Sequence, residues 1–319
     1  MQRRNRRLLS LLTAAALALL LLTACNRAAD PQTLRLAVLP ILDNLPMYVA
    51  DEQGFFAEEG LTVEFIPVGS AAERDQVIQA GQADGMINEL LSTQLYNDPE
   101  IQVVVVSYSR VATPEYPQYQ VLAAGPSGIT TPEQLAGQDI GISEGTIIEY
   151  ATDRLLEAAG LAPEEIQTIA VPGIADRMSL LASGELPAAT LPDPLASLAI
   201  QNGAVVVIDD TSHPEFGHST YAFRQSFVDE NPRVIEGFLR AVGRGVEAIN
   251  ADKEAFSDLL VERQLVPQPL IGSYTVPDFP EPSVPPQSVW DDVLAWAQAK
   301  GYVQGSPDYA DSVSDAFLP

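Results

Sequence analysis

The chain has 319 residues, with 43 acidic and 17 basic side chains and a formal net charge of −26. Such an acidic surface repels nucleic acid and anionic lipid, and we therefore exclude nucleic acid as a partner. A single cysteine allows no disulfide within the chain, so stability must come from a packed core, for which the length is ample.

The first 24 residues have the charge and length of a secretory signal peptide. Four arginines lie among the first seven residues, and an almost wholly apolar run over residues 8–24 follows, slightly short for a membrane-spanning helix. The run ends in Leu22-Thr23-Ala24-Cys25, which resembles the lipobox of bacterial lipoproteins. The resemblance implies cleavage before Cys25, lipid attachment to its sulfur and a tether over residues 25–32. A buried or free thiol, or an uncleaved signal anchor, is the alternative.

The following sequence alternates between strand and helix patterns. We predict strands at residues 34–39, 61–66, 84–88 and 102–108, and helices at residues 45–59 and 70–81. After a crossing segment we predict strands at residues 119–124, 139–143, 166–171, 186–191, 204–208 and 221–227. The accompanying helices begin at Thr131 or span residues 146–160, 174–183, 231–250, 253–263 and 289–299, with a proline-rich loop at 276–286.

Strands that alternate with helices indicate parallel sheets with helices on both faces. The pattern occurs twice, and the two units are joined by crossings near Tyr119 and Tyr221. Two lobes around a cleft follow from this arrangement, and a cleft between lobes is a preferred site for a small ligand.

Several motifs resemble a known family. Residues 46–61 match the pattern P-x-Y-V-A-x-x-x-G-F-F-x-x-E-G-L, residues 79–85 are similar to its x-x-G-Q-x-D step, and residues 139–146, 184–194 and 309–319 resemble later steps. Their order and spacing resemble the periplasmic-type solute-binding proteins for nitrate, sulfonate, taurine and thiamine-pyrimidine precursors.

This resemblance implies the type II two-lobed fold, an α/β architecture of two mostly parallel sheets flanked by helices with a double-strand hinge. Lobe 1 would comprise residues 33–119 and 224–319, and residues 120–223 would form the hinge strands and lobe 2. The implied function is the extracytoplasmic solute-binding component of an ABC importer. Such a protein closes on a small molecule and delivers it to an ABC permease. We expect a monomer without a cofactor, attached to a bacterial membrane, at the cell surface or in the periplasm, only by its lipid.

The resemblance places the ligand at loops after strands and at the starts of the following helices, where free N–H groups point into the cleft. The candidate ligand-binding residues are Asp43, Asn44, Ser70, Asn88, Glu89, Tyr108, Arg110, Gly145, Thr146 and Asp193. Several also fit purely structural roles. Ser70 and Thr146 fit helix caps, Asp43 and Asn44 an Asx-turn, and Asp193 a proline-flanked turn. The only two histidines, His213 and His218, lie among turn residues, and we expect no metal site.

Acidic side chains dominate the candidate positions and predict the kind of ligand. Asp43, Glu89, Glu144, Glu149 and Asp193 are opposed only by Arg110. This balance favours a neutral or cationic heterocycle, such as a thiamine-type pyrimidine, over sulfonate, taurine or nitrate. Tyrosines such as Tyr48, Tyr108 and Tyr150 would stack on its ring.

Two other functions compete with solute transport. Pyrimidine-synthesising enzymes that resemble this family use a cysteine cluster and a histidine, whereas the only cysteine here is Cys25. No catalytic residues are therefore predicted, and the chain is expected not to be an enzyme. A sensor or adaptor lipoprotein that binds a ligand and signals to a membrane receptor stays open.

Overall fold

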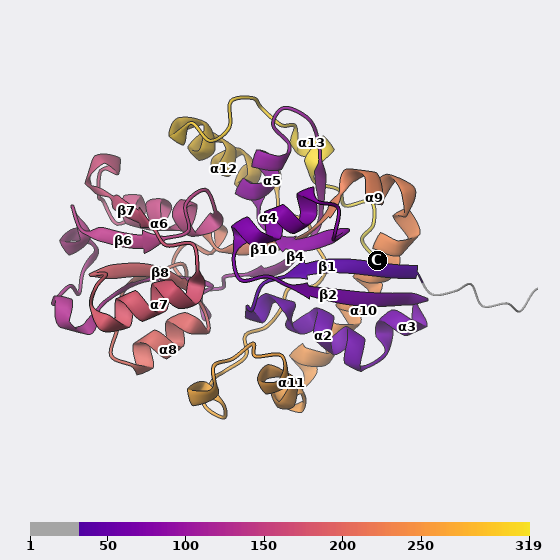
Figure 1. Cartoon of the computed structure of the whole chain (residues 1–319), viewed down its shortest axis with the longest axis horizontal. Coiled ribbons are helices and arrows are strands. Elements are labelled where there is room, and N and C mark those ends of the chain that lie inside the picture. Colours follow the sequence, from indigo (N-terminus) through magenta and orange to yellow (C-terminus); the bar gives the residue numbers. More distant parts are fainter. Residues whose placement is uncertain (1–31) are drawn as a thin grey trace, which may run out of the picture.

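The computed structural model describes residues 32–319. The predicted signal peptide, Cys25 and nearly all of the predicted tether lie outside the described residues. Two five-stranded sheets flanked by helices form two lobes, with the first lobe on the right and the second on the left in Figure 1. The predicted two-lobed α/β fold is thereby confirmed. No helix among residues 32–319 combines the length and apolar character needed to cross a membrane.

The first lobe has the strand order β2-β1-β3-β10-β4. Its strands are β1 (Gln32–Val38), β2 (Leu61–Pro67), β3 (Gly85–Asn88), β4 (Val103–Val111) and β10 (His218–Arg224). Strand β1 is parallel to β2 and β3, whereas β10 is antiparallel to β3 and β4. The sheet is therefore mostly parallel, and β1, β2 and β3 end at the same edge.

The second lobe has the strand order β7-β6-β8-β5-β9. Its strands are β5 (Tyr119–Ala123), β6 (Asp139–Ile142), β7 (Gln167–Ala170), β8 (Ala188–Pro192) and β9 (Val205–Asp209). Here β5 is the antiparallel strand, paired with β8 and β9. Each lobe thus inserts one reversed strand into a parallel sheet.

Helices cover the sheets on both sides (Figure 1). The first sheet is accompanied by α2 (Leu45–Glu52), α3 (Phe55–Glu58), α4 (Ala71–Gln79), α5 (Leu90–Tyr96), α9 (Gln225–Glu230), α10 (Pro232–Ala251), α11 (Ser257–Glu262) and α13 (Tyr309–Ser312). The second sheet is accompanied by α6 (Ile147–Ala158), α7 (Ile174–Ser183) and α8 (Leu195–Gln201), and α12 (Gln287–Lys300) contacts both lobes.

Two chain segments connect the lobes, residues 112–118 between β4 and β5 and residues 210–217 between β9 and β10. Asp210 ties them together, because its carboxylate accepts hydrogen bonds from the backbone N–H groups of Gln118 and Tyr119, both at 2.9 Å. A Cβ at Gly217 would overlap this carboxylate, so the approach requires glycine. The second crossing lies before β10 rather than near Tyr221, which is itself paired with Ile87 and Ser107.

Helix α12 also bridges the lobes. On the first lobe, Gln94 Nε2 donates to the carbonyl oxygen of Trp290 at 2.9 Å. On the second lobe, Lys300 Nζ lies 2.7 Å from Asp153 Oδ2 and 3.1 Å from Glu149 Oε1, both on α6. The C-terminal part of the chain therefore contributes contacts to both halves.

Some predicted elements differ from the observed ones. The single helix expected over residues 45–59 is two helices, because Gly54 adopts a left-handed φ of 75° between them. The helix expected from Thr131 is only a 3-10 turn, Pro132–Leu135. The strand expected to reach Phe227 ends at Arg224, where α9 follows directly. The short helices α5 and α8 were not predicted.

Candidate functional site

A cavity lies between the two lobes at the carboxyl ends of the parallel strands. It holds about 570 Å³ of empty space, part of it open to solvent. This is the edge where α/β proteins bind ligands. The first lobe lines it with Leu39, Ile41, Asp43, Ala71, Arg74, Ile87, Asn88, Glu89 and Ser219, and the second with Tyr119, Ser143, Thr146, Ile147, Ile148, Pro172, Ile174, Arg177 and Pro192.

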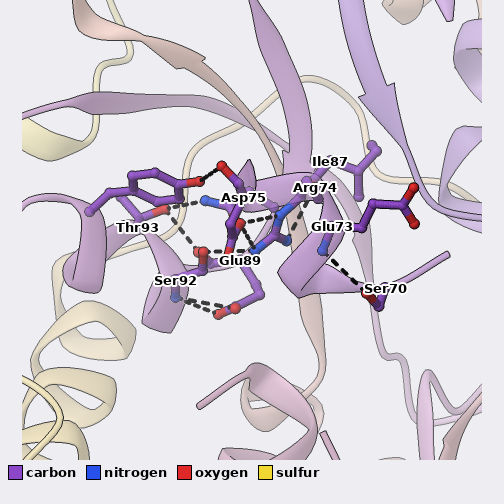
Figure 2. A network of polar contacts seen from close by, with 10 residues as sticks. Ser70, Glu73, Arg74, Asp75, Ile87, Glu89, Ser92 and Thr93 are labelled. Carbon is purple, nitrogen blue, oxygen red and sulfur yellow. Dashed lines mark hydrogen bonds and ion pairs between the residues drawn. The ribbon is translucent and has the colours of Figure 1, made fainter. Parts of the chain in front are cut away.

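Arg74 organises the first-lobe wall (Figure 2). It reaches from the first turn of α4, where Nε donates to Asp75 Oδ1 at 2.8 Å and Nη1 donates to the carbonyl oxygen of Ile87 at 3.3 Å. Nη2 donates to Ser92 Oγ at 2.8 Å, so protein partners already satisfy this guanidinium. Its role in the described structure is to fix the end of β3 against α4 and α5.

Glu89 begins α5 and lies at the cavity wall. Both carboxylate oxygens accept from the Ser92 N–H, at 3.2 and 3.1 Å, which caps the helix. Burial raises the pKa of Glu89 to about 7, against the opposing effect of the nearby Arg74 charge. The Glu89 carboxyl therefore titrates near neutral pH.

Arg177 on α7 is fully buried in the second-lobe wall. Nε donates to the carbonyl oxygen of Thr190 at 3.0 Å, and Nη1 donates to those of Val171 at 2.7 Å and Pro172 at 3.4 Å. Nη2 has no hydrogen-bond partner among residues 32–319. Burial lowers the pKa of Arg177 to about 10, so the guanidinium stays charged at neutral pH. The second lobe thus presents a cation held only by neutral carbonyl groups.

Asp43 connects the cavity wall to the crossing segments. Its Oδ1 accepts from Ser219 Oγ at 3.0 Å and from Gln118 Nε2 at 3.3 Å. Burial raises the pKa of Asp43, and the charge of Arg110 opposes that rise. This carboxylate therefore belongs both to the cavity wall and to the polar network under the crossing segments.

Arg110 and Asp193 line a separate cavity near the first crossing. Arg110 donates to the carbonyl oxygens of Asp193 and Pro117, both at 3.1 Å. The Asp193 carboxylate accepts from Ser197 and from the hydroxyl of Tyr274. The structure therefore separates these two candidates from Asp43, Asn88, Glu89 and Thr146, which line the interlobe cavity.

The remaining predicted residues hold local structure. Asn44 donates to the carbonyl oxygens of Leu39 and Ile41, and Ser70 Oγ accepts from Glu73 N at 3.2 Å as the cap of α4. Thr146 Oγ1 accepts from Ile148 N at 3.2 Å, so this cavity residue also caps α6. Gly145 donates to Glu149 Oε2 at 2.8 Å. Tyr108 packs edge-on against His218, outside the interlobe cavity.

The predicted excess of acids over cations in the site is wrong. Glu144 is exposed, Glu149 is bound by Lys300 and Tyr302, and Asp193 lies in the other cavity. Sequence reasoning missed Arg74 and Arg177 because it considered only loops and helix caps. The predicted stacking residues Tyr48, Tyr108 and Tyr150 do not line the interlobe cavity, whereas Tyr119 does.

A signal for both arginines was present in the sequence. Each occupies the fourth position of its helix, in Ala71-Ala72-Glu73-Arg74 and Ile174-Ala175-Asp176-Arg177. A cation close to a helix N-terminus opposes the helix dipole and requires a local reason. The repeated acid–arginine pair also follows the edge strand of each sheet, β2 and β7, at matching places in the two lobes.

Comparisons with known proteins agree with this architecture. A family model described as NMT1/THI5 like matches residues 42–255. A formylaminopyrimidine-binding protein of Halalkalibacterium halodurans is 24% identical over 313 residues, which cover 90% of this chain and 93% of that protein.

Solved structures extend the likeness to the fold. The alkanesulfonate-binding protein SsuA from Xanthomonas axonopodis pv. citri, bound to MOPS, superposes with a TM-score of 0.75 at 15% identity, covering 90% of this chain and 99% of that one. The periplasmic nitrate-binding protein NrtA from Synechocystis PCC 6803 gives 0.74 at 17% identity, covering 91% and 88%. At these identities the likeness shows the shared two-lobed fold.

Proposed function

Because the chain belongs to the NMT1/THI5-like family, we propose that it is the extracytoplasmic solute-binding component of an ABC importer. It captures a small organic molecule between its lobes and delivers it to an ABC permease, without catalysis and without a cofactor. The interlobe cavity at the carboxyl ends of both sheets carries this proposal. Relatives named for binding formylaminopyrimidine and alkanesulfonate support it.

The ligand we propose carries an acceptor group, anionic or carbonyl-like, that meets Arg177. A buried charged donor without a partner costs free energy until a ligand satisfies it. Nη2 of Arg177 is such a donor among the described residues. The apolar side chains of Ile41, Ile147 and Ile174 also line the cavity and suit the carbon skeleton of a small organic ligand. Sulfonates and formylaminopyrimidines both supply a suitable acceptor. This proposal specifies an acceptor group on the ligand, so the thiamine-type pyrimidine that the sequence favoured stays a candidate beside sulfonate, taurine and nitrate.

A thermal-shift screen of the purified chain tests this function. The panel contains nitrate, sulfonates, taurine, pyrimidines and flavins. A ligand that binds only the folded state at about a hundredfold excess over Kd should raise Tm by about 5 °C. The shift should vanish in Arg177→Met. The matched control Arg224→Met lies at the far end of β10 from Ser219 and should keep it. No shift with any class, or an equal shift in Arg177→Met, contradicts the proposal.

We also propose that Cys25 carries the lipid that holds the protein, as a monomer, at the outer side of a bacterial membrane. The lipobox-like Leu22-Thr23-Ala24-Cys25 supports this localisation. Mass spectrometry of the N-terminal peptide of the membrane-extracted chain should show Cys25 as its first residue, with a diacylglyceryl mass on the sulfur. An N-terminal peptide that carries Cys25 without this mass would disprove lipid attachment there.

A further inference from the structure

Two residues that line the interlobe cavity each have a buried polar atom without a hydrogen-bond partner, an acceptor in one case and a donor in the other. Asn88 Oδ1 on the first lobe and Arg177 Nη2 on the second have no partner among residues 32–319. Asn88 is 1% exposed and Arg177 is 0% exposed, so neither atom is compensated by bulk water. Both residues line the same cavity, one from each lobe.

The orientation of the Asn88 amide follows from its neighbours. Thr93 Oγ1 donates its only proton to the carbonyl oxygen of Glu89, at 2.8 Å. Thr93 can therefore only accept from Asn88, and the group that faces it at 3.0 Å must be the Asn88 NH2. Oδ1 is consequently the unpaired atom, and Asn88 offers the cavity an acceptor rather than a donor.

Comparison of the two lobes explains why the donor is on the second one. Arg74 and Arg177 occupy the same helix position, and each bonds a strand carbonyl, Ile87 in β3 and Thr190 in β8. Asp75 follows Arg74 and supplies its counter-charge, whereas Met178 follows Arg177. The first-lobe arginine is neutralised and the second-lobe arginine is left charged and incompletely bonded.

Acidic side chains reinforce the acceptor character of the first lobe. The carboxylates of Glu89 and Asp43 lie on the same wall as Asn88. Because the pKa of Glu89 is about 7, its carboxylate only accepts hydrogen bonds above neutral pH, and in either protonation state a carboxyl oxygen keeps lone pairs that accept. The cavity is therefore polarised, with acceptors on the first lobe and a cationic donor on the second.

We infer that the solute itself has two poles, an N–H donor such as an amine or amide that meets Asn88 and Glu89, and an anionic or acceptor group that meets Arg177. This inference rests on the proposed function and specifies its substrate. A molecule with both groups satisfies one unpaired atom on each lobe at once and so links capture to closure of the lobes. A simple anion satisfies only Arg177 and leaves Asn88 Oδ1 unpaired.

Matched pairs of probes test the two poles. The pairs are 2-aminoethanesulfonate with ethanesulfonate, and a formylaminopyrimidine with its analogue lacking the amine, titrated calorimetrically into the purified chain. The amine-bearing member of a binding pair should bind about tenfold more tightly, since a lost hydrogen bond to a buried group costs a factor of roughly five to a hundred or more. Asn88→Leu should abolish the preference, and Arg177→Met should weaken both members. Arg177→Lys retains the charge, and partial recovery of binding in this variant separates loss of the charge from misfolding.

A control addresses general destabilisation. Asn250→Leu removes two hydrogen bonds to Phe279, away from the cavity residues, and should lower Tm while keeping the preference. Equal or tighter binding of the amine-free member overturns the two-pole inference and leaves the proposed function intact. If no probe binds, the chain is incubated with a culture extract, and native mass spectrometry then identifies any solute that it has captured. A captured solute without an N–H group overturns the inference, and capture of nothing contradicts the proposed function as well.

Discussion

Asp210 should make the folding stability fall as pH rises, contrary to the usual effect of a paired carboxylate. Its side chain is fully buried at the crossing segments, and burial raises its pKa to about 7 from an ordinary value of 3.8. Between these pH values the folded chain holds a proton that the unfolded chain releases. The stabilisation is therefore complete below about pH 4 and is lost as pH rises through about 7.

The shift in the pKa of Asp210 sets an upper limit on this change in stability. The two pKa values differ by about 3, which corresponds to at most about 4 kcal/mol of unfolding free energy. Asp210→Asn removes the titration, and its amide can accept from only one of the two N–H groups, those of Gln118 and Tyr119, that Asp210 now satisfies. The variant should therefore be less stable at low pH and should approach the wild type near pH 8.

Urea unfolding between about pH 4 and about pH 8 measures the difference between wild type and Asp210→Asn. We expect that difference to shrink with rising pH. Asp84→Asn is a control of opposite sign, because hydrogen bonds from Arg35 and Arg224 lower the pKa of Asp84 against the effect of its burial. Its difference from wild type should be nearly constant between about pH 4 and about pH 8 and should shrink only below about pH 4, where the unfolded carboxyl is protonated. A difference for Asp210→Asn that is constant or grows with pH would refute the reasoning.

Two further substitutions test packing between distant parts of the chain. Lys300→Met leaves Glu149 and Asp153 without their cation. Since Lys300 is about one-third exposed, we expect the free energy of unfolding in urea to fall by about 1–3 kcal/mol. Unchanged stability would show that these ion pairs do not hold α12 against α6. Gly245→Ala places a methyl group against the Pro46 carbonyl, where α10 crosses α2, and should cost about 1–3 kcal/mol. Gly243→Ala, on the same helix, meets only ring carbons of Pro282, at 3.2 and 3.6 Å, and should stay within about 1 kcal/mol of wild type. Equal losses for both glycines would contradict this difference.

Local sequence patterns, that is apolar runs and helix caps, predict most of the fold. The apolar runs that became β1, β4 and β6 and the caps at Ser70 and Thr146 are recognisable without tertiary information. The predicted helix boundaries are wrong where a single residue changes the direction of the backbone. Gly54, within an otherwise helical pattern, adopts a left-handed conformation and separates α2 from α3.

The candidate site was less predictable because its charge balance depends on tertiary packing. Asn88 and Glu89 could be found, since polar residues directly after a buried strand need a reason. Asp193 also follows a strand, and Arg110 lies near the end of β4, but Tyr274 from a distant loop joins Asp193 in a different cavity. Arg177 was overlooked because a helix position does not by itself reveal which partners a side chain lacks.

A crystal structure of the chain with the tightest ligand from the solute screen tests the central claim most directly. We expect electron density between the lobes, with ligand atoms at about 2.7–3.2 Å from Arg177 Nη2 and from Asn88 Oδ1. A ligand bound in the cavity beside Arg110 and Tyr274, or outside the cleft altogether, would contradict a solute-binding function of the interlobe site.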